Sequence, residues 1–220
     1  MAKHKLARFA ENETFPNLFQ HTQFDVKGEG FPLKGKWHQD YFKNDNPIVL
    51  ELGCGKGEYT IALSKRFPDK NFIGVDRKGA RLWRGCKDAV EQDLLQVAFI
   101  RTAIDDIDFY FEKDEVSEIW ITFPDPQPTK ERKRLMSPHF VGKYTNFLKK
   151  NGIIHLKTDS RLLYEYTQSV IETEHWHLFD NIEHVYNQEE NLLLTEIQTF
   201  YEKRWLNEGS LISYLSFSVK

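Results

Sequence analysis

The chain contains little cysteine. Its 220 residues include only Cys54 and Cys86, which have neither the spacing of metal ligands nor the density of a disulfide scaffold. We interpret both as reduced, buried small residues, and no neighbouring histidine supports a nucleophilic role for Cys54. The eight histidines also form no ligand pattern, so we expect no metal site.

Long apolar runs are missing as well. No segment approaches the roughly 18 apolar residues of a membrane span, and the start MAKHKLARFAENETF has no apolar signal region. We therefore expect a cytoplasmic protein that does not contact a membrane. The net charge of −3 gives no excess of positive charge, which argues weakly against a general nucleic-acid binder. The sequence leaves open whether the protein is a monomer or a homodimer.

The chain contains enough apolar residues to form a hydrophobic core, since 40% of its residues are hydrophobic and 14% are aromatic. Strand-like and helix-like segments alternate, which favours one α/β domain over residues 1–220 with a doubly wound, mostly parallel sheet. Residues 1–45 are expected to form an N-terminal arm, and residues 187–209 a substrate-binding insertion between two late strands. The expected helices cover 58–67, 78–93, 138–149 and 161–172, and the seven expected strands cover 48–50, 71–75, 97–100, 119–122, 153–157, 176–186 and an antiparallel C-terminal strand at 211–219.

A glycine-rich loop follows the first of the expected core strands, in the segment PIVLELGCGKGEYT. Its glycines at alternate positions, Gly53, Gly55 and Gly57, permit positive φ and let a ligand approach the backbone. The helix that follows presents free N–H groups at its start. The loop is therefore a candidate cofactor site, and the alternative is a glycine-rich turn that binds nothing.

The spacing of the loop distinguishes between cofactors. The dinucleotide fingerprint needs a glycine at its sixth position, where this chain has Glu58, so NAD is disfavoured. Glu51, just before the loop, would repel a pyrophosphate but attract an ammonium group. S-adenosylmethionine carries an ammonium and a sulfonium and no phosphate, and the loop resembles the first motif of Rossmann-like methyltransferases.

Two further strand ends fit the same nucleoside. Asp76 ends the strand NFIGV about twenty residues beyond the loop, where an acid binds ribose hydroxyls in folds of this kind. Asp76 could instead, or in addition, cap the helix that follows. After the third strand, Ala103 and Ile104 could give an adenine ring apolar contact and backbone hydrogen bonds.

The segment IWITFPDPQP is the most informative in the chain, because a carboxylate, Asp125, stands between two prolines at a strand end. Proline fixes its own φ and disfavours the helical region for the residue before it, so we expect residues 123–127 to form a stiff, extended loop. A fixed carboxylate at such a place suggests a site. The alternative is a turn whose aspartate caps the next helix.

A basic run follows this loop, and further basic residues stand near the N-terminus, at Lys3, Lys5 and Arg8. The run consists of Lys130, Arg132, Lys133 and Arg134. Such runs are usually solvated surface, but this one adjoins the suspected site, which favours contact with the phosphates of a nucleic acid.

In this order, the motifs VLELGCGKGEYT, NFIGVD, ITFPDPQPTKERKRL, IIHLKTD and TFYEKRW resemble the bacterial tRNA (guanine-N7)-methyltransferase family, with a Rossmann-like fold. The resemblance implies methyl transfer from S-adenosylmethionine to guanine 46 in the variable loop of tRNA. It assigns the following roles by position: cofactor contacts to Glu51, Gly53, Gly55, Asp76, Ala103, Ile104 and Asp125; catalysis to Asp125; substrate contacts to Thr129, Lys130, Asp159, Thr199, Phe200, Tyr201 and Glu202.

The chain departs from the family pattern at three places. Gln127 replaces a usual tryptophan, Thr129 replaces a usual lysine whose role Lys130 could take, and Ala103 stands where an acid is common. Phe123 or Tyr201 could supply the stacking surface that the tryptophan provides elsewhere. Two other classes of function remain as alternatives: a methyltransferase of small molecules or proteins, and a non-catalytic RNA-binding module.

Overall fold

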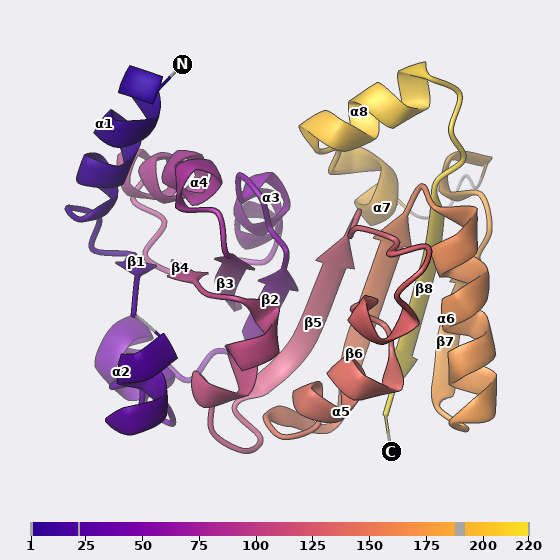
Figure 1. Ribbon diagram of the computed structural model, residues 1–220, viewed down its shortest axis with the longest axis horizontal. Coiled ribbons are helices and arrows are strands. Elements are labelled where there is room, and N and C mark those ends of the chain that lie inside the picture. The colour runs from indigo at the N-terminus through magenta and orange to yellow at the C-terminus, as the bar shows by residue number, and fades with distance from the viewer. Residues whose placement is uncertain (1, 22, 188–191, 220) are drawn as a thin grey trace.

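A mixed sheet forms the centre of the computed structural model, which describes residues 2–21, 23–187 and 192–219. Within these residues the sheet has eight strands in the order β1-β4-β3-β2-β5-β6-β8-β7 (Figure 1). Strand β8 pairs antiparallel with β6 and β7, and the other neighbours pair parallel. The strands are β1 (Leu18–Phe19), β2 (Ile48–Leu52), β3 (Asn71–Asp76), β4 (Val97–Arg101), β5 (Val116–Thr122), β6 (Leu148–Thr158), β7 (His177–Ile182) and β8 (Ser213–Ser218).

Helices cover both faces of this sheet. The α-helices are α1 (Ala2–Asn12), α2 (Gln23–Gly28), α3 (Glu58–Arg66), α4 (Gly79–Glu91), α5 (Pro138–Tyr144), α6 (Arg161–Thr173), α7 (Leu192–Glu196) and α8 (Phe200–Asn207). Four short helical turns complete the description: η1 (Trp37–Phe42), η2 (Ile104–Phe109), η3 (Glu131–Lys133) and η4 (Val185–Asn187). No helix in these described ranges is long and apolar enough to cross a membrane.

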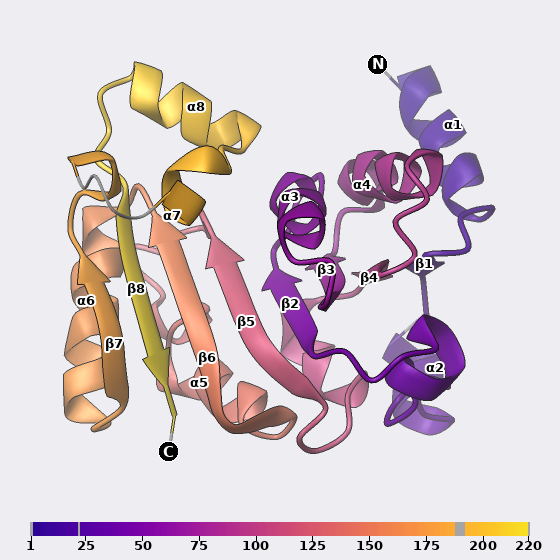
Figure 2. The same cartoon turned by 180° about the vertical axis from the view of Figure 1, so that it is seen from behind.

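Two apolar clusters lie on opposite faces of the sheet, because successive residues of each strand alternate between them. In β2, Leu50 belongs to the cluster that contains residues of α5, α6, η1 and η2. Its neighbour Val49 belongs to the cluster that contains residues of α3, α4 and α7. Figures 1 and 2 show these layers from the two sides. The sheet is therefore doubly wound, as the sequence predicts.

The expected strands are all present, with the two-residue β1 added at one edge of the sheet. Several expected boundaries are wrong. The strand expected at 176–186 ends at Ile182, and residues 185–187 form η4. The helix expected at 138–149 ends at Tyr144, and the strand expected at 153–157 already begins at Leu148. The apolar residues between them, Phe147 and Leu148, are buried in the core beside β5, so tertiary packing rather than helical periodicity sets this boundary.

The described part of the first 45 residues packs into the body of the fold. Trp37 is fully buried, and its indole N–H donates to the carbonyl of Tyr110 at 3.1 Å. Glu115 holds the same segment, because its carboxylate accepts the N–H groups of Gly35 at 3.0 Å and Trp37 at 3.3 Å. Residues 1–45 were expected to be an arm. In the described part of them, α1 packs against α4 and β1 joins the sheet, while Trp37 belongs to the apolar cluster on the opposite face.

The order of the sheet reverses between β2 and β5. From β2 the chain adds β3 and β4 on one side, and β5 and β6 lie on the other. In open α/β sheets, ligands bind outside the carboxyl ends of the strands at such a point. Glu51 near the end of β2 and Thr122 at the end of β5 therefore mark where the site should lie.

Candidate active site at the carboxyl ends of the strands

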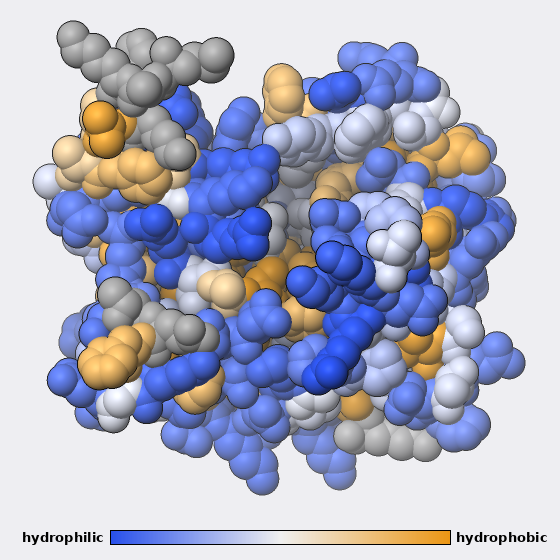
Figure 3. Space-filling view, viewed as in Figure 1, coloured by the Kyte–Doolittle hydropathy of each residue, from blue (hydrophilic) through white to orange (hydrophobic). Residues whose placement is uncertain are grey.

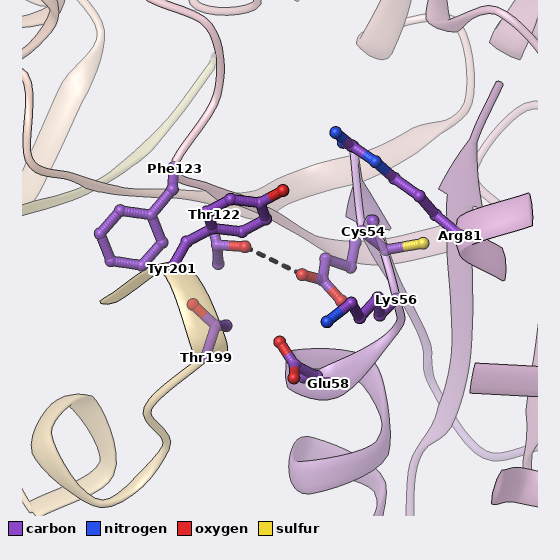
Figure 4. Close-up of a pocket in the computed structure, with 11 residues that line it drawn as sticks. Cys54, Lys56, Glu58, Arg81, Thr122, Phe123, Thr199 and Tyr201 are labelled. Atoms are coloured by element: carbon purple, nitrogen blue, oxygen red, sulfur yellow. Dashed lines mark hydrogen bonds between the residues drawn. The ribbon is translucent and has the colours of Figure 1, made fainter. Parts of the chain in front are cut away.

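A pocket lies at this switch point, with an empty volume of ≈ 530 Å³ that includes space open to solvent. It is lined by Glu51, Gly53, Cys54, Gly55, Lys56, Glu58, Arg81, Thr122, Phe123, Thr199 and Tyr201. Figure 4 shows Thr122, Phe123, Thr199 and Tyr201 on one side, with Cys54, Lys56 and Glu58 on the other. In the space-filling view the molecule is hollowed between the α3 and α4 region and the α8 region (Figure 3).

Glu51 is the buried acid of this pocket, with 3% of its surface exposed. Thr122 Oγ1 donates to its Oε1 at 2.9 Å, and the Thr60 N–H donates to its Oε2 at 2.8 Å. The Thr60 hydroxyl also donates to Oε2. Burial raises the pKa of Glu51 to about 7 in spite of these bonds, and the nearby Asp76 carboxylate adds to the rise. A bound cation would offset this cost.

Three glycines of the loop have positive φ, with values of 81° at Gly53, 60° at Gly55 and 73° at Gly57. A Cβ at Gly53 or Gly55 would meet open space, so the backbone there is free for a ligand to approach. A Cβ at Gly57 would instead lie 2.6 Å from the Phe99 ring. The first two glycines therefore serve the pocket, and the third serves packing.

Asp76 ends β3 beside the glycine loop. Its Oδ2 accepts the Gly55 N–H at 3.0 Å, and its Oδ1 accepts the Lys78 N–H at 2.7 Å. The N-cap of α4 is Lys78, and no side chain caps it, so the alternative role of Asp76 as the helix cap is not what the structure shows. Each Asp76 oxygen retains a lone pair that a ribose hydroxyl could use.

The proline loop differs from the extended form that we expected. Phe123 and Gln127, which precede Pro124 and Pro128, have φ values of 49° and 45°. Positive φ is uncommon for bulky residues and is typical of functional sites that the surrounding structure holds in place. Asp125 is exposed, lies outside the pocket lining, and accepts the Gln127 N–H with Oδ1 at 3.1 Å. It does not cap the next helical turn, η3, which has no side-chain cap.

The start of α8 closes the other side of the pocket. Thr199 caps this helix by accepting the Glu202 N–H at 3.1 Å, and this places Tyr201 in the pocket lining. The Phe200 N–H donates to Glu58 at 3.0 Å, and the Lys56 ammonium lies 4.6 Å from the Phe200 ring. Phe200 and Tyr201 remain 56% and 39% exposed, so two aromatic faces are available beside the glycine loop.

Glu202, expected among the substrate contacts, is fully buried and forms an ion pair with the equally buried Lys157 at 2.6 Å. Tyr186 donates to the same Glu202 oxygen at 2.8 Å. Lys157 also donates to the carbonyl of Leu194 and, at 3.2 Å, to that of Ile197. In this arrangement Lys157 of β6 holds α8 through Glu202 and α7 through the Leu194 carbonyl. Residues 188–191 of the expected insertion lie outside the described residues.

The remaining predicted residues are spread around the same edge of the sheet. Asp159 follows β6 and is half-buried, which raises the pKa of its carboxyl. Thr129 and Lys130 are exposed beyond the proline loop. Ala103 and Ile104 follow β4 but do not line the pocket, and Ile104 packs against the core. Side chains at positions 3 and 5 of the expected N-terminal basic group lie outside the description.

Sequence reasoning missed several residues of the pocket. Thr60 and Thr122 bind Glu51 but carry no motif of their own, and Arg81 reaches the pocket from the first turn of α4. The alternation of β5, which places Thr122 on the same face as Trp120, was the one available signal. Cys54 lies in the lining, but burial raises the pKa of its thiol well above the usual value, which disfavours the nucleophilic thiolate.

This combination of fold and pocket defines the Rossmann-like methyltransferases. Among solved structures, the 16S rRNA methyltransferase KamB superposes with a TM-score of 0.64 at 13% identity, covering 84% of this chain and 93% of that one. A family model described as "Putative methyltransferase" matches residues 45–215.

Two relatives identify the family more narrowly. A tRNA (guanine-N(7)-)-methyltransferase of Christiangramia forsetii is 50% identical over 100% of this chain and 99% of its own. One of Bacteroides fragilis is 48% identical, covering 99% of this chain and 86% of its own. The chain belongs to the tRNA (guanine-N7)-methyltransferase family.

The residues present fit S-adenosylmethionine, the methyl donor of this class. Glu51 is a buried carboxylate whose pKa is raised by burial, and the ammonium group of the donor would offset that cost. Gly53 and Gly55 leave open space beside the backbone for the donor. The described residues contain no group of His, Cys, Asp and Glu that could hold a metal ion.

Proposed function

We propose that the protein transfers the methyl group of S-adenosylmethionine to N7 of guanine in tRNA, at position 46 of the variable loop. The main support for this proposal is that one pocket is lined on one side by a candidate cofactor loop and on the other by candidate substrate-binding residues. The glycine loop with Glu51 forms one side, and Phe123, Thr199 and Tyr201, from the proline loop and α8, form the other.

The donor supplies an electrophilic methyl group on a sulfonium. The task of this chain is to hold that donor with Glu51 at its ammonium, Asp76 at its ribose, and Ala103 and Ile104 beside its adenine. Thr60 and Thr122 keep the Glu51 carboxylate in place by three hydrogen bonds. A carboxylate fixed in this way costs no reorganisation when a cation binds.

Guanine N7 has an exposed lone pair, so the acceptor needs alignment and no general base. Phe123 and Tyr201 offer aromatic surfaces on which the purine can stack. As the purine gains positive charge, the fixed Asp125 carboxylate stabilises a charge that grows toward the transition state. We propose that Asp125 and Asp159 accept hydrogen bonds from the N–H groups on the guanine edge. Glu202 is not available for this role, because it forms an ion pair with Lys157.

The tRNA backbone requires cations, although the chain has a net charge of −3. Lys130, Arg132 and Lys133 are exposed beyond the proline loop and form no ion pair within the described residues. They are therefore free to neutralise phosphates. A tRNA substrate also supports a cytoplasmic location for the protein.

The direct test is nucleoside analysis by mass spectrometry. Unmodified tRNA is incubated with the protein and S-adenosylmethionine carrying a deuterated methyl group, and then digested to nucleosides. We expect labelled 7-methylguanosine, with Glu51→Ala as the inactive control. Label in another nucleoside would overturn the proposal, as would donor binding without any tRNA labelling, which would favour a small-molecule or protein substrate.

A further inference from the structure

Arg134 differs from the basic residues that precede it. Lys130, Arg132 and Lys133 are exposed, whereas Arg134 is 4% exposed. We expected all four to contact phosphate. A side chain that is buried to this degree cannot form the open surface that a tRNA backbone requires.

The buried guanidinium donates hydrogen bonds to backbone carbonyls of the proline loop. Its Nε donates to the carbonyls of Pro126 at 3.2 Å and Gln127 at 3.3 Å, and Nη2 donates to the carbonyl of Pro128 at 3.2 Å. These are three consecutive carbonyls of one loop. Nη1 reaches Glu131 at 3.3 Å, so every nitrogen of the guanidinium has a partner.

A second contact fixes the plane of the guanidinium. The ring of Tyr166, from α6, lies 4.3 Å from the Arg134 Cζ. Stacking on an aromatic ring and a fork of donors are properties of arginine that lysine lacks, because lysine is a point charge on a flexible stem. The proline loop is thus tied to α6 through one side chain.

The same loop residue connects Arg134 to Asp125. The Gln127 N–H donates to Asp125 Oδ1 at 3.1 Å, while the Gln127 carbonyl accepts from Arg134. Gln127 also has a φ of 45°, which its neighbours must hold in place. The Pro126 carbonyl, which Arg134 Nε also holds at 3.2 Å, belongs to the same planar peptide as the Gln127 N–H. If that carbonyl were released, the peptide could rotate, and the N–H that orients Asp125 would move with it.

We propose that Arg134 is a positioning residue for methyl transfer, which acts by holding the carbonyls of residues 126–128 and so fixing the Asp125 carboxylate. This inference rests on the function proposed above. It assigns tRNA phosphate contact to Lys130, Arg132 and Lys133 and removes Arg134 from that group.

The test compares Arg134→Lys with the matched control Arg66→Lys, at an exposed residue of α3 that does not line the pocket. Both variants keep the charge, and only the first loses the fork of donors to the loop. At saturating tRNA and donor, we expect the single-turnover rate of Arg134→Lys to fall by roughly 10- to 100-fold. Its tRNA affinity, the salt dependence of that affinity and its donor affinity should stay within about twofold of wild type, because the lost contacts act on orientation and not on binding.

A double-mutant cycle with Asp125→Asn distinguishes positioning from general damage. If Arg134 acts through the Asp125 charge, Arg134→Lys should slow the Asp125→Asn protein by less than about threefold. If Arg134→Lys slows the Asp125→Asn protein as much as it slows wild type, the proposal is overturned. An Arg134→Lys variant with a normal saturated rate and weakened, less salt-dependent tRNA binding would also overturn it, and would make Arg134 a phosphate contact.

A third measurement does not depend on activity. The Lys130 N–H donates at 3.2 Å to the same Gln127 carbonyl that Arg134 holds. Amide hydrogen exchange at Gln127 and Lys130 should become at least about tenfold faster in Arg134→Lys and stay unchanged in Arg66→Lys. Unchanged exchange in both would contradict the proposal, even if wild-type protein methylates nothing. If wild-type protein is inactive but exchange is accelerated in Arg134→Lys, only the proposed function is contradicted.

A second variant is available should Arg134→Lys fold poorly. Tyr166→Leu removes only the stacking on Arg134, and it should give a smaller decrease in rate and a smaller acceleration of exchange.

Discussion

Thr122 Oγ1 donates a 2.9 Å hydrogen bond to Glu51 Oε1, and this bond joins the carboxyl ends of the two strands between which the sheet order reverses (Figure 4). The two side chains come from positions 71 residues apart. Thr122 is followed directly by the proline loop, and Glu51 by the glycine loop. The hydrogen bond therefore couples the side of the pocket that we assign to the donor with the side that we assign to the base.

Binding of S-adenosylmethionine should depend on pH through Glu51. The pKa of this carboxyl is about 7, and only its ionised form attracts an ammonium, so affinity should fall as the pH drops below 7. Between pH 8 and pH 6 we expect a loss of roughly tenfold, measured by titration calorimetry in EDTA. Glu51→Gln should bind weakly at both pH values; an unchanged wild-type affinity across this range would exclude Glu51 as the ammonium partner.

The same carboxyl should destabilise the ligand-free protein at high pH. Its folded pKa of about 7 lies above the ordinary 4.5, so its contribution to stability is present below pH 4.5 and is lost as the pH rises toward 7. Gln at this position cannot ionise, and its amide can donate to Thr122 Oγ1. Glu51→Gln should therefore be more stable than wild type at pH 8, on the order of 1–3 kcal/mol, and closer to wild type at pH 5. Urea unfolding at the two pH values measures this difference.

The exposed basic residues should control the salt dependence of tRNA binding. Replacing Lys130, Arg132 and Lys133 by Ala should weaken tRNA binding and make the slope of log K against log salt shallower by roughly 2 to 3. Each phosphate contact that is lost means that about one counterion fewer is released when the tRNA binds. Donor affinity should not change.

The matched control for this variant removes three other exposed lysines. Lys113, Lys149 and Lys150 lie at the opposite edge of the sheet, where β5 and β6 begin. Their triple Ala variant loses the same net charge and should keep a wild-type slope. Equal slopes in the two triple variants would mean that the run after the proline loop is only solvated surface.

The buried pair of Lys157 and Glu202 should behave as a unit. Burial lowers the pKa of Lys157 and raises the pKa of Glu202, while their mutual attraction opposes both shifts. Lys157→Met leaves the Glu202 charge buried without its cation and should cost about 3–5 kcal/mol of unfolding free energy. Lys157→Met combined with Glu202→Leu should recover most of that loss, since apolar pairs often replace buried ion pairs at little cost. A double variant no more stable than Lys157→Met would show that the two side chains are not coupled.

Asp125 should matter for the rate more than for the fold. Asp125→Asn keeps the oxygen that accepts the Gln127 N–H and removes the charge, so melting temperature and both affinities should change little. The single-turnover rate should fall roughly 10²-fold, about 2.7 kcal/mol of barrier. A stable variant with a near-normal rate would refute the catalytic assignment, and a destabilised variant with a normal rate per folded molecule would make Asp125 a turn residue.

The parts of this site that the sequence predicts are those with a local signal. Gly53 and Gly55 directly follow a strand and line the pocket, and Asp76 ends the next strand, β3, as the spacing predicts. Arg134 and Glu202 lie in charged stretches that suggest exposure, but tertiary packing buries both against partners far away along the chain. No local pattern predicts such burial. The positive φ values before Pro124 and Pro128 have the same origin, because they are imposed by the structure around the loop.

The most direct measurement of the central claim concerns the acceptor atom. A tRNA that carries 7-deazaguanosine at position 46 has C–H in place of N7, so it lacks the attacking lone pair and keeps the remaining edges of the base. We expect this tRNA to bind the protein with unchanged affinity and to accept no labelled methyl group from S-adenosylmethionine, while the unmodified transcript yields labelled 7-methylguanosine. Methyl transfer to the 7-deaza tRNA at the normal rate would contradict attack by N7 of this guanine.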